Sequence, residues 1–383
     1  MSLRRYRLAS LVVRPLSVPL LDPFVIATGR VDATRSAEVR VVLEGERGER
    51  AEGLGEGAAL WPVTREDQPE VVAGLEKAAA GLTGATVNLP DADGTEPFDL
   101  SAVEELGALL DGVLFEAPVA RAALETAICD AWARVLGLPL RTLFGGAVGE
   151  ATRRIETDIT IPIAEPVRMA ELARGWAARG FLHFKVKVGK DVDRDLAALF
   201  AIASAVPGAR FRIDANEGFS AAEAIALARA VEARQLVVEC YEQPCRAGDL
   251  EGMAAVAEAV EPPVIADESV KTLADLERVR AARAADGVNL KLVKSGGPLG
   301  ALAIGRMAVA AGMPLMVGGM VETRLGMTAA AHVAAGLGGV SFADLDTAWL
   351  LAADPYEGGY EAEGPQYVLP DAPGLGVISR GAS

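Results

Sequence analysis

Five short apolar runs each end in a charged residue: FKVK (184–187), FRID (211–214), VVECYE (237–242), PVIAD (263–267) and VNLK (288–291). The end residues are Lys187, Asp214, Glu242, Asp267 and Lys291, which follow one another at intervals of 27, 28, 25 and 24 residues. An interval of about 25 residues is the length of one strand, one helix and two short loops. If the strands are parallel and close into a barrel, their carboxyl ends meet at one mouth, where barrel active sites lie. We therefore expect these five charges to share one site.

The same pattern continues on both sides of these runs and predicts a complete barrel. The candidate strands are 155–160, 183–188, 210–214, 236–242, 263–267, 287–292, 314–318 and 340–344. The segments between them are rich in Ala and Leu, as in 220–233 and 299–311, and have helical composition and apolar spacing. Eight strands that alternate with helices predict an α/β barrel with a parallel sheet over residues 121–350.

The first 120 residues have a different organisation. Strand-like runs at 3–14 and 37–44 and a glycine-rich stretch, GLGEG (53–57), precede helical segments near 67–82 and 101–112. This order predicts a separate α+β domain over 1–120. Segment 119–137 reads as one helix that ends at Gly137, with Pro139 just beyond it. The last segment, 351–383, is rich in Gly and Pro and too short to fold alone, so we expect it to pack back onto the first domain.

Composition excludes several classes of protein. The 383 residues suit a barrel of about 250 residues plus a second domain. The net charge of −16 argues against nucleic acid and anionic membranes as partners. No apolar stretch predicts a membrane span, and the basic start lacks the pattern of a signal peptide. Three cysteines without metal-site spacing suit a reduced cytoplasm, and two histidines make a histidine-rich metal site improbable.

The first four charged strands suggest a metal site with flanking bases. On strand 183–188, Lys185 and Lys187 share the face opposite to the apolar residues, and such inward lysines need nearby anions. Asp214, Glu242 and Asp267 offer only oxygen ligands from successive strands, a set that suits Mg²⁺, one ion per subunit. The alternative is that each of these acids caps the helix that follows it.

The chemistry that fits this arrangement is proton abstraction next to a carboxylate. Lys291 is expected opposite Lys187 across the mouth, where a cation and a second lysine would lower its pKa in the direction a base requires. A metal-stabilised ene-diolate with one amine on each face leads to inversion at the carbon, which is racemisation or epimerisation. Lys294, beside Gly296 and Gly297, is interpreted as a loop lysine.

At this point the sequence resembles the enolase superfamily, and within it the muconate-lactonizing-enzyme subgroup. The matching motifs are GLGEG (53–57), ETAICDAWARVLGLPLRTLFGG (125–146), FKVKVG (184–189), RIDANEGF (212–219), YEQP (241–244), ADES (266–269) and NLKLVKSGG (289–297). The resemblance covers nearly the whole chain. It implies a (β/α)7β-type modified TIM barrel with an α+β N-terminal capping domain completed by the C-terminal segment. It also implies that the protein is an isomerase.

The resemblance also implies a role for each motif residue. Lys187 and Lys291 become the two bases and Lys185 an electrostatic helper, while Asp214, Glu242 and Asp267 become the Mg²⁺ ligands. The neighbouring polar residues Asn216 and Glu268 then support these ligands.

Within the subgroup, the end of the eighth strand points to dipeptide epimerases. FADLDTAWLL (342–351) places Asp344 and Asp346 two residues apart, similar to the Asp-x-Asp motif with which those enzymes hold the free α-ammonium of a dipeptide. TDITIP (157–162) and GGMVETR (318–324) are also similar, and they place Thr160 near the substrate. The alternatives within the subgroup are an N-acylamino acid racemase, an o-succinylbenzoate synthase or a muconate-type cycloisomerase. A non-catalytic amino-acid or peptide binder on the same scaffold is the alternative from another class.

Specificity and assembly are less defined by the sequence. The family's mobile capping loop corresponds to 24–34, where Ala-Glu epimerases carry an arginine in a pattern similar to F-x-x-A-x-R. Here Gly29 stands at that place and Arg30 follows it, so Arg30 either contacts the substrate or is solvated. The sequence therefore does not define which dipeptide side chains the enzyme accepts. The resemblance further implies a homo-oligomer.

Overall fold

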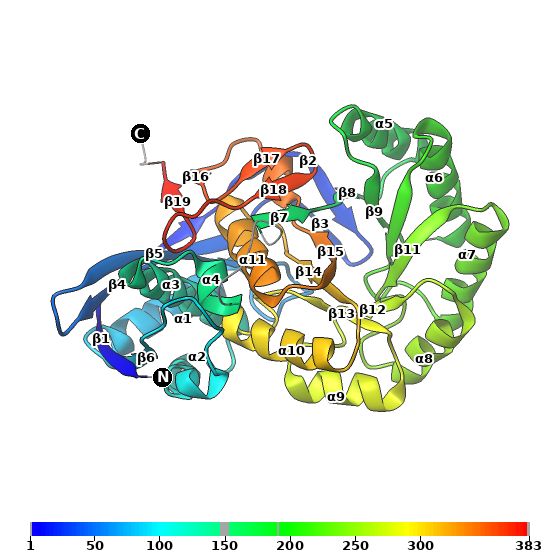
Figure 1. Cartoon of the computed structure of the whole chain (residues 1–383). Coiled ribbons are helices and arrows are strands. Elements are labelled where there is room, and N and C mark those ends of the chain that lie inside the picture. Colours follow the sequence, from blue (N-terminus) through cyan, green and yellow to red (C-terminus); the bar gives the residue numbers. More distant parts are fainter. Residues whose placement is uncertain (1, 146–152, 190, 381–383) are drawn as a thin grey trace.

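The computed structural model describes residues 2–145, 153–189 and 191–380. Gly146, the last residue of the 125–146 motif, lies outside the described residues. Figure 1 shows two parts of the molecule side by side: an antiparallel sheet with its helices, and a barrel. The predicted barrel with an α+β N-terminal domain is confirmed.

Eight parallel strands form the barrel in sequence order. They are β8 (Ile159–Ile161), β9 (His183–Lys187), β10 (Arg210–Asp214), β11 (Val237–Glu242), β12 (Val264–Ala266), β13 (Gly287–Leu290), β14 (Leu315–Gly318) and β15 (Val340–Asp344). The first and last strands, β8 and β15, form a seam rather than a regular ladder. At this seam the Asp158 N–H donates to the Ala343 carbonyl at 3.1 Å, which nearly closes the barrel.

Helices connect successive strands around the outside of the barrel (Figure 1). They are α5 (Pro166–Ala177), α6 (Val192–Ala205), α7 (Ala221–Ala233), α8 (Leu250–Ala259), α9 (Leu273–Ala282), α10 (Pro298–Ala310) and α11 (Arg324–Leu337). Side-chain caps fix several of their starts, for example Ser220, which accepts the Glu223 N–H at the start of α7. A short 3-10 helix, η3 (Thr347–Leu350), follows β15 in place of an eighth α-helix. Among the described residues this is the (β/α)7β arrangement.

The barrel interior holds an apolar group below its charged mouth. Cys240, Ile265, Met316 and the half-buried Phe342 pack together from four strands. Two residues beyond Cys240 and Phe342 along the same strands come Glu242 and Asp344, because every second residue of a strand faces the same side. Glu242 and Asp344 therefore lie one layer above this apolar group, at the carboxyl ends of their strands, whereas the buried Lys185 and Arg212 are in register with Cys240.

The N-terminal domain is a four-stranded antiparallel sheet in the order β5-β4-β1-β6, built from β1 (Leu3–Leu16), β4 (Ser36–Gly45), β5 (Arg50–Ala58) and β6 (Thr86–Pro90). Helices α1 (Gln68–Leu82) and α2 (Glu104–Leu114) belong to the same domain. A hairpin of β2 (Pro19–Ile26) and β3 (Gly29–Ala33) extends from it towards the barrel. Near the mouth, the Ile163 N–H donates to the Val25 carbonyl at 2.9 Å, so the hairpin is attached to the loop after β8.

Helix α3 (Pro118–Leu136) is buried on nearly every side. It packs on β5 through the glycines of GLGEG, because a Cβ at Gly55 would lie 1.9 Å from the Ala123 carbonyl oxygen. On its other side, the carboxylate of Glu125 accepts the Leu299 N–H of α10 at 2.8 Å. The expected domain boundary near residue 120 falls inside this helix, and the domain boundaries at residues 120 and 350 stay predictions.

The C-terminal segment contacts both parts of the chain. Its strands are β16 (Tyr356–Gly358), β17 (Glu361–Glu363), β18 (Gln366–Val368) and β19 (Val377–Ser379). The Leu375 N–H donates to Asp130 on α3 at 2.7 Å, and the Tyr356 hydroxyl donates to Glu38 on β4. Strand β18 pairs with β7 (Arg154–Glu156). The expected strand 155–160 is therefore two short strands, since β7 pairs with the C-terminal segment before the chain turns into β8.

No helix among the described residues has both the length and the apolar character needed to cross a membrane.

Candidate active site at the barrel mouth

Strand register aligns the first three charged residues. Lys187 pairs with Asp214 across β9 and β10, and Asp214 pairs with Glu242 across β10 and β11. Asp267 directly follows β12, and Lys291 directly follows β13. All five side chains are buried, as expected when neighbouring parallel strands end at the same level.

Each predicted base lies against a different predicted metal ligand. The Lys187 Nζ lies 2.6 Å from Asp214 Oδ2, and the Lys291 Nζ lies 2.6 Å from Asp267 Oδ2. Lys185, one pleat below Lys187, places its Nζ 2.7 Å from Glu242 Oε2 and 3.1 Å from Asp214 Oδ2. The structure therefore brings together the three lysines and three carboxylates that the sequence singled out.

Lys294 was interpreted as a loop lysine, and it does lie in the turn after β13. Its side chain is nevertheless buried, and the Nζ donates to both Asp267 Oδ1 and the Asp267 backbone carbonyl. It also donates to the Asn289 carbonyl at 3.1 Å. Lys294 therefore holds Asp267 in place, a contact that spacing alone did not indicate.

Burial and charge act in opposite directions on these groups. Burial alone would lower the pKa of Lys185, but the carboxylates of Asp344, Glu242 and Asp214 raise it well above its usual value. Burial likewise opposes the charge of Lys291, and Asp267 raises the pKa of that amine. Conversely, burial raises the pKa of Glu242 to about 7, with the neighbouring Asp214 charge adding to the effect. A cation shared by the carboxylates would relieve this repulsion.

Two amide side chains that the sequence reasoning missed orient the carboxylates. Asn289 on β13 donates through Nδ2 to Glu242 Oε1 at 2.8 Å. Gln243 accepts the Asp267 N–H at 2.8 Å and the Ser269 N–H at 3.1 Å through one oxygen. The signal for Asn289 was present in VNLK, because Asn289 and Lys291 alternate as Lys185 and Lys187 do.

Asn216 and Glu268, which the sequence predicted as supports of the ligands, contact each other beside Asp214. The Asn216 Nδ2 donates to Glu268 Oε1 at 3.2 Å, and the Asn216 N–H donates to Asp214 Oδ1 at 2.9 Å. Several buried oxygens of this group have no hydrogen-bond partner among the described residues. They are Asn216 Oδ1, Glu268 Oε2 and Asn289 Oδ1, whereas Glu242 Oε2 has only its ion pair with the Lys185 Nζ at 2.7 Å.

These oxygens and the predicted ligands fit a hard cation. Mg²⁺ prefers oxygen donors, several of them carboxylate, in an octahedral arrangement. The donor set here is entirely oxygen, and its unsatisfied members are buried, where an unpaired polar atom is costly. The residues present are therefore compatible with the group that the sequence predicted.

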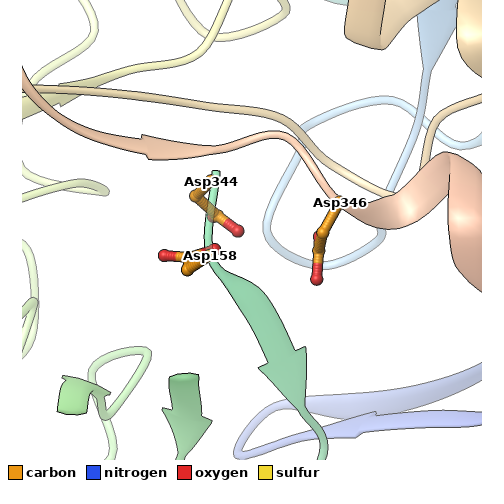
Figure 2. Close-up of side chains that lie close together, drawn as sticks. All are labelled: Asp158, Asp344 and Asp346. Carbon is orange, nitrogen blue, oxygen red and sulfur yellow. The ribbon is translucent and has the colours of Figure 1, made fainter. Parts of the chain in front are cut away.

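A second acidic cluster lies beside the first. Asp158, Asp344 and Asp346 each offer an oxygen within 4.8 Å of the others. Figure 2 shows Asp344 at the end of β15, Asp158 just before β8 and Asp346 ahead of η3. Asp344 and Asp346 were predicted from their spacing, whereas Asp158 was not, although it alternates with Thr160 in the quoted TDITIP motif.

Each of these three carboxylates already has a cationic or N–H partner on one oxygen. Lys185 Nζ donates to Asp344 Oδ2 at 2.6 Å, and Arg212 Nη1 donates to Asp158 Oδ2 at 2.8 Å. The Thr160 backbone N–H donates to Asp346 Oδ2. The remaining oxygens, Asp158 Oδ1 and Asp346 Oδ1, are buried without a partner among the described residues. Burial and the Asp344 charge raise the pKa of Asp346 to about 7, so this cluster favours an added cation.

One small cavity lies at the barrel mouth beside these groups. Among its lining residues are Lys187, Lys291, Asn216, Asp344 and Thr160. The two predicted bases therefore face the same space, together with one aspartate of the predicted ammonium site. The capping domain lines its upper part with Phe24, Ile26, Leu60 and Val63.

Arg30 lies away from this group. Its guanidinium is more than half exposed and pairs with Asp32 on the same strand, with 2.7 Å between Nη2 and Oδ1. Residues Phe24 and Ile26 of the same hairpin line the cavity instead. A substrate contact for Arg30 stays a prediction.

The family model described as enolase C-terminal domain-like matches residues 168–380, more than half of the chain. The protein belongs to this family, as the motifs predicted.

Its relatives extend the likeness over the capping domain. The chain is 38% identical over 366 residues to an L-Ala-D/L-amino acid epimerase of Populus trichocarpa, covering 94% of this chain and 82% of the relative. It is 37% identical over 363 residues to an aromatic dipeptide epimerase of Herpetosiphon aurantiacus, covering 94% and 96% of the two chains.

Solved structures agree in fold. A substrate-liganded complex of the L-Ala-D/L-Glu epimerase from Bacillus subtilis superposes with a TM-score of 0.87 at 33% identity, covering 97% of this chain and 99% of that one. The dipeptide epimerase from Enterococcus faecalis V583, complexed with Mg and the dipeptide L-Leu-L-Tyr, gives 0.85 at 31% identity, covering 98% and 99%.

Proposed function

We propose that the protein is a Mg²⁺-dependent dipeptide epimerase that inverts the α-carbon of the C-terminal residue. The observation that carries this proposal is the shared cavity, which Lys187 and Lys291 line together with Asp344 and Thr160. Two amines beside one space suit removal of a proton from one face of a carbon and return of a proton to the other. The names of its relatives support the same reaction.

Asp214, Glu242 and Asp267 are the residues that would hold the Mg²⁺ ion. Each is buried and each comes from a neighbouring strand, and Glu242 Oε2 has only its ion pair with Lys185. The Mg²⁺ of the Enterococcus faecalis complex supports this assignment. When Mg²⁺ is bound, it stabilises the negative charge that develops on the substrate carboxylate as the α-proton leaves.

The lysines carry out the proton transfer in this proposal. The Asp267 carboxylate raises the pKa of Lys291, so Lys291 in this arrangement is charged and able to donate. In the opposite direction, the Lys291 Nζ accepts a proton from the substrate only when this amine is no longer paired with the Asp267 carboxylate. Lys187 performs the matching step on the other face, and Lys185 adds positive charge next to Glu242 and Asp214.

Asp344 and Asp346 would bind the free ammonium at the other end of the dipeptide, with Asp158 as a third acid. A substrate cation would satisfy the free Asp346 Oδ1 and relieve the charge repulsion in this cluster. An N-acyl or N-succinyl group is neutral or anionic there, so this cluster favours dipeptides over the substrates of the other enzymes in the subgroup.

Proton NMR in D₂O tests the function directly. The purified enzyme with Mg²⁺ is incubated with a panel of dipeptides and, in parallel, with N-acetyl and N-succinyl amino acids. We expect deuterium to enter the C-terminal α-position of some dipeptides with accumulation of the second epimer. Exchange confined to the N-acylated compounds would favour the racemase alternative, and no exchange in any compound would leave the proposal without support.

We also propose that the protein is cytoplasmic and forms a homo-oligomer. Its three cysteines, Cys129, Cys240 and Cys245, are buried and unpaired, which suits a reducing compartment. Self-association rests on the family resemblance, and light scattering coupled to size-exclusion chromatography tests it: a monomer at micromolar concentration would contradict it.

A further inference from the structure

A second cleft adjoins the site at the end where the ammonium would bind. It has a volume of ≈ 390 Å³ and lies between β2 of the capping hairpin and α5 of the barrel. Phe24 and Thr160 line both this cleft and the cavity of the two lysines. The cleft therefore shares a wall with the site, and it is large enough for one side chain, since small-molecule pockets span about 300–1,000 Å³.

The walls of this cleft are fixed to one another. The Val25 carbonyl accepts the Ile163 N–H at 2.9 Å, and Leu20 forms a β-bridge with Leu351. At the outer edge, Arg168 of α5 pairs with Asp22 of β2, with 3.2 Å between Nη2 and Oδ1. The capping hairpin and the barrel thus form a defined groove rather than a chance gap between loops.

The interior of the cleft is mainly apolar. Its wall side chains include Phe24, Leu172, Trp176 and Leu350. Its charges are balanced, because the acids Asp22 and Glu171 face the bases Arg168 and Arg179. Arg168 pairs with both acids, and Arg179 lies over the Trp176 ring at 4.2 Å. Binding of an apolar side chain in such a pocket is favourable because apolar surface is buried. The pocket has no net charge to attract an ion.

The position of Thr160 decides which part of a dipeptide enters. Its backbone N–H donates to Asp346, one of the acids proposed for the ammonium, and Thr160 also lines the cleft. In a dipeptide the first side chain branches from the carbon that carries the ammonium. The carboxylate end, by contrast, would lie towards Asp214 at the end of β10 and Asp267 just after β12.

We propose that the cleft between β2 and α5 binds the side chain of the first residue of the dipeptide and favours large apolar side chains there. This inference rests on the proposed epimerase function and adds the substrate class. Contacts made away from the reacting carbon can raise kcat/KM when they fix the substrate in its reactive position. We therefore expect kcat/KM for Leu- and Phe-first dipeptides to exceed that for Gly-first dipeptides by about tenfold or more.

A series with one common second residue tests this. The substrates are Gly-Ala, Ala-Ala, Leu-Ala, Phe-Ala, Lys-Ala and Glu-Ala, with epimerisation of the second residue followed by NMR. We expect Leu-Ala and Phe-Ala to give the highest kcat/KM. A preference for Lys-Ala, Glu-Ala or Gly-Ala, or equal values throughout, would overturn the assignment.

The variant Gly175→Leu tests the same assignment by filling the cleft. Gly175 lies on α5 at the cleft, and a Cβ there meets no atom within 4 Å, so a larger side chain enters the cleft without a backbone clash. We expect the ratio of kcat/KM for Leu-Ala over Gly-Ala to fall at least tenfold. Gly81→Leu, on α1 and equally open, is the control and should keep the ratio of the unmodified enzyme.

The two proposals fail in different ways. If no dipeptide exchanges its α-proton, the epimerase function fails and this inference with it. If dipeptides epimerise but Gly175→Leu leaves the ratio unchanged, only the side-chain subsite fails. Circular dichroism melting of both variants verifies that they fold.

Discussion

Lys185 on β9 and Asp344 on β15, the strands on either side of β8, are joined by a 2.6 Å hydrogen bond between Nζ and Oδ2. The same amine lies 2.7 Å from Glu242 Oε2, so one buried cation connects the carboxylates proposed for Mg²⁺ with those proposed for the ammonium. The charge at either end of the substrate site therefore affects the other end through Lys185. This relationship explains why two acidic clusters can be buried side by side.

Asp346→Asn should weaken recognition of the free ammonium. The variant loses the charge of a carboxylate whose Oδ1 is unpartnered among the described residues. A hydrogen bond to a charged group contributes about 1.5–3 kcal/mol, so kcat/KM for dipeptides should fall ~10- to 150-fold. Steady-state epimerisation kinetics measure this, with the exposed Asp193→Asn of α6 as the control. A variant with unchanged kcat/KM would remove Asp346 from the binding site.

Lys187→Ala and Lys291→Ala should each abolish epimerisation and leave exchange from one face. The two amines contact different carboxylates, Asp214 and Asp267, and so serve opposite faces of the substrate carbon in our proposal. We expect each variant to incorporate deuterium into one epimer only, and the two variants to select opposite epimers. NMR in D₂O measures this, with the exposed Lys77→Ala as the control. Normal epimerisation by either variant would contradict the two-base assignment.

Asn289→Ala should lower the affinity for Mg²⁺. The variant removes the amide that donates to Glu242 Oε1 and leaves that carboxylate free to rotate. Losing such a support of a metal ligand typically reduces metal affinity about 10- to 100-fold. Calorimetric titration with MgCl₂ measures it without relying on activity. Asn88→Ala removes an exposed amide–carboxylate contact in the capping domain and should bind Mg²⁺ normally; equal loss in both variants would argue against a specific role.

Glu322→Gln should stabilise the protein at alkaline pH. Burial, with the nearby Glu56 carboxylate, raises the pKa of Glu322 to about 8. Between the unfolded pKa of about 4.3 and pH 8 the native state holds a proton that the unfolded chain has lost. The free energy of unfolding therefore falls as pH rises through this range, by up to about 1.4 kcal/mol per pH unit.

Urea denaturation at several pH values measures this dependence. The Glu322→Gln variant should show a flatter profile between pH 5 and 8, because its amide does not titrate. The exposed Glu261→Gln variant should retain the profile of the unmodified protein. Identical profiles for all three proteins would show that Glu322 is ionised in the folded state at neutral pH.

Two glycine substitutions should change stability in opposite directions. A Cβ at Gly55 of β5 would lie 1.9 Å from the Ala123 carbonyl oxygen, so Gly55→Ala forces β5 and α3 apart and should destabilise by about 1–3 kcal/mol or more. Gly81 of α1 meets nothing within 4 Å, and Gly81→Ala should stabilise by about 0.5–1 kcal/mol through helix propensity. Urea denaturation compares them. An unaffected Gly55→Ala would show that the contact between β5 and α3 can relax.

Local pattern predicted the barrel well because the charged residues mark the strand ends. The run 210–214 was predicted as a strand and is one, and it ends at Asp214 because its neighbours also end at this level. Segment 155–160 was harder to assign, since its division depends on β18, more than 200 residues later. Strand pairing over such a distance leaves no periodic signal in the segment itself.

The site was predicted where side-chain alternation carried the information. Lys185 and Lys187 followed from this rule, and Asn289 would have followed from it as well. The hydrogen bond from Lys294 to Asp267 depends on the conformation of the turn after β13. The pairing of Arg30 with Asp32 depends on the geometry of the hairpin. Neither contact has a counterpart in sequence spacing.

Helix α3 contacts the capping domain, the barrel and the C-terminal segment. Its side towards β5 is closed by the glycine contacts, its Glu125 is bonded to α10, and its Asp130 is bonded to the C-terminal segment. A helix that is buried all round belongs to a core and to neither surface of an interface. The capping domain and the barrel therefore share a single hydrophobic interior, and heating should unfold them together in one cooperative transition.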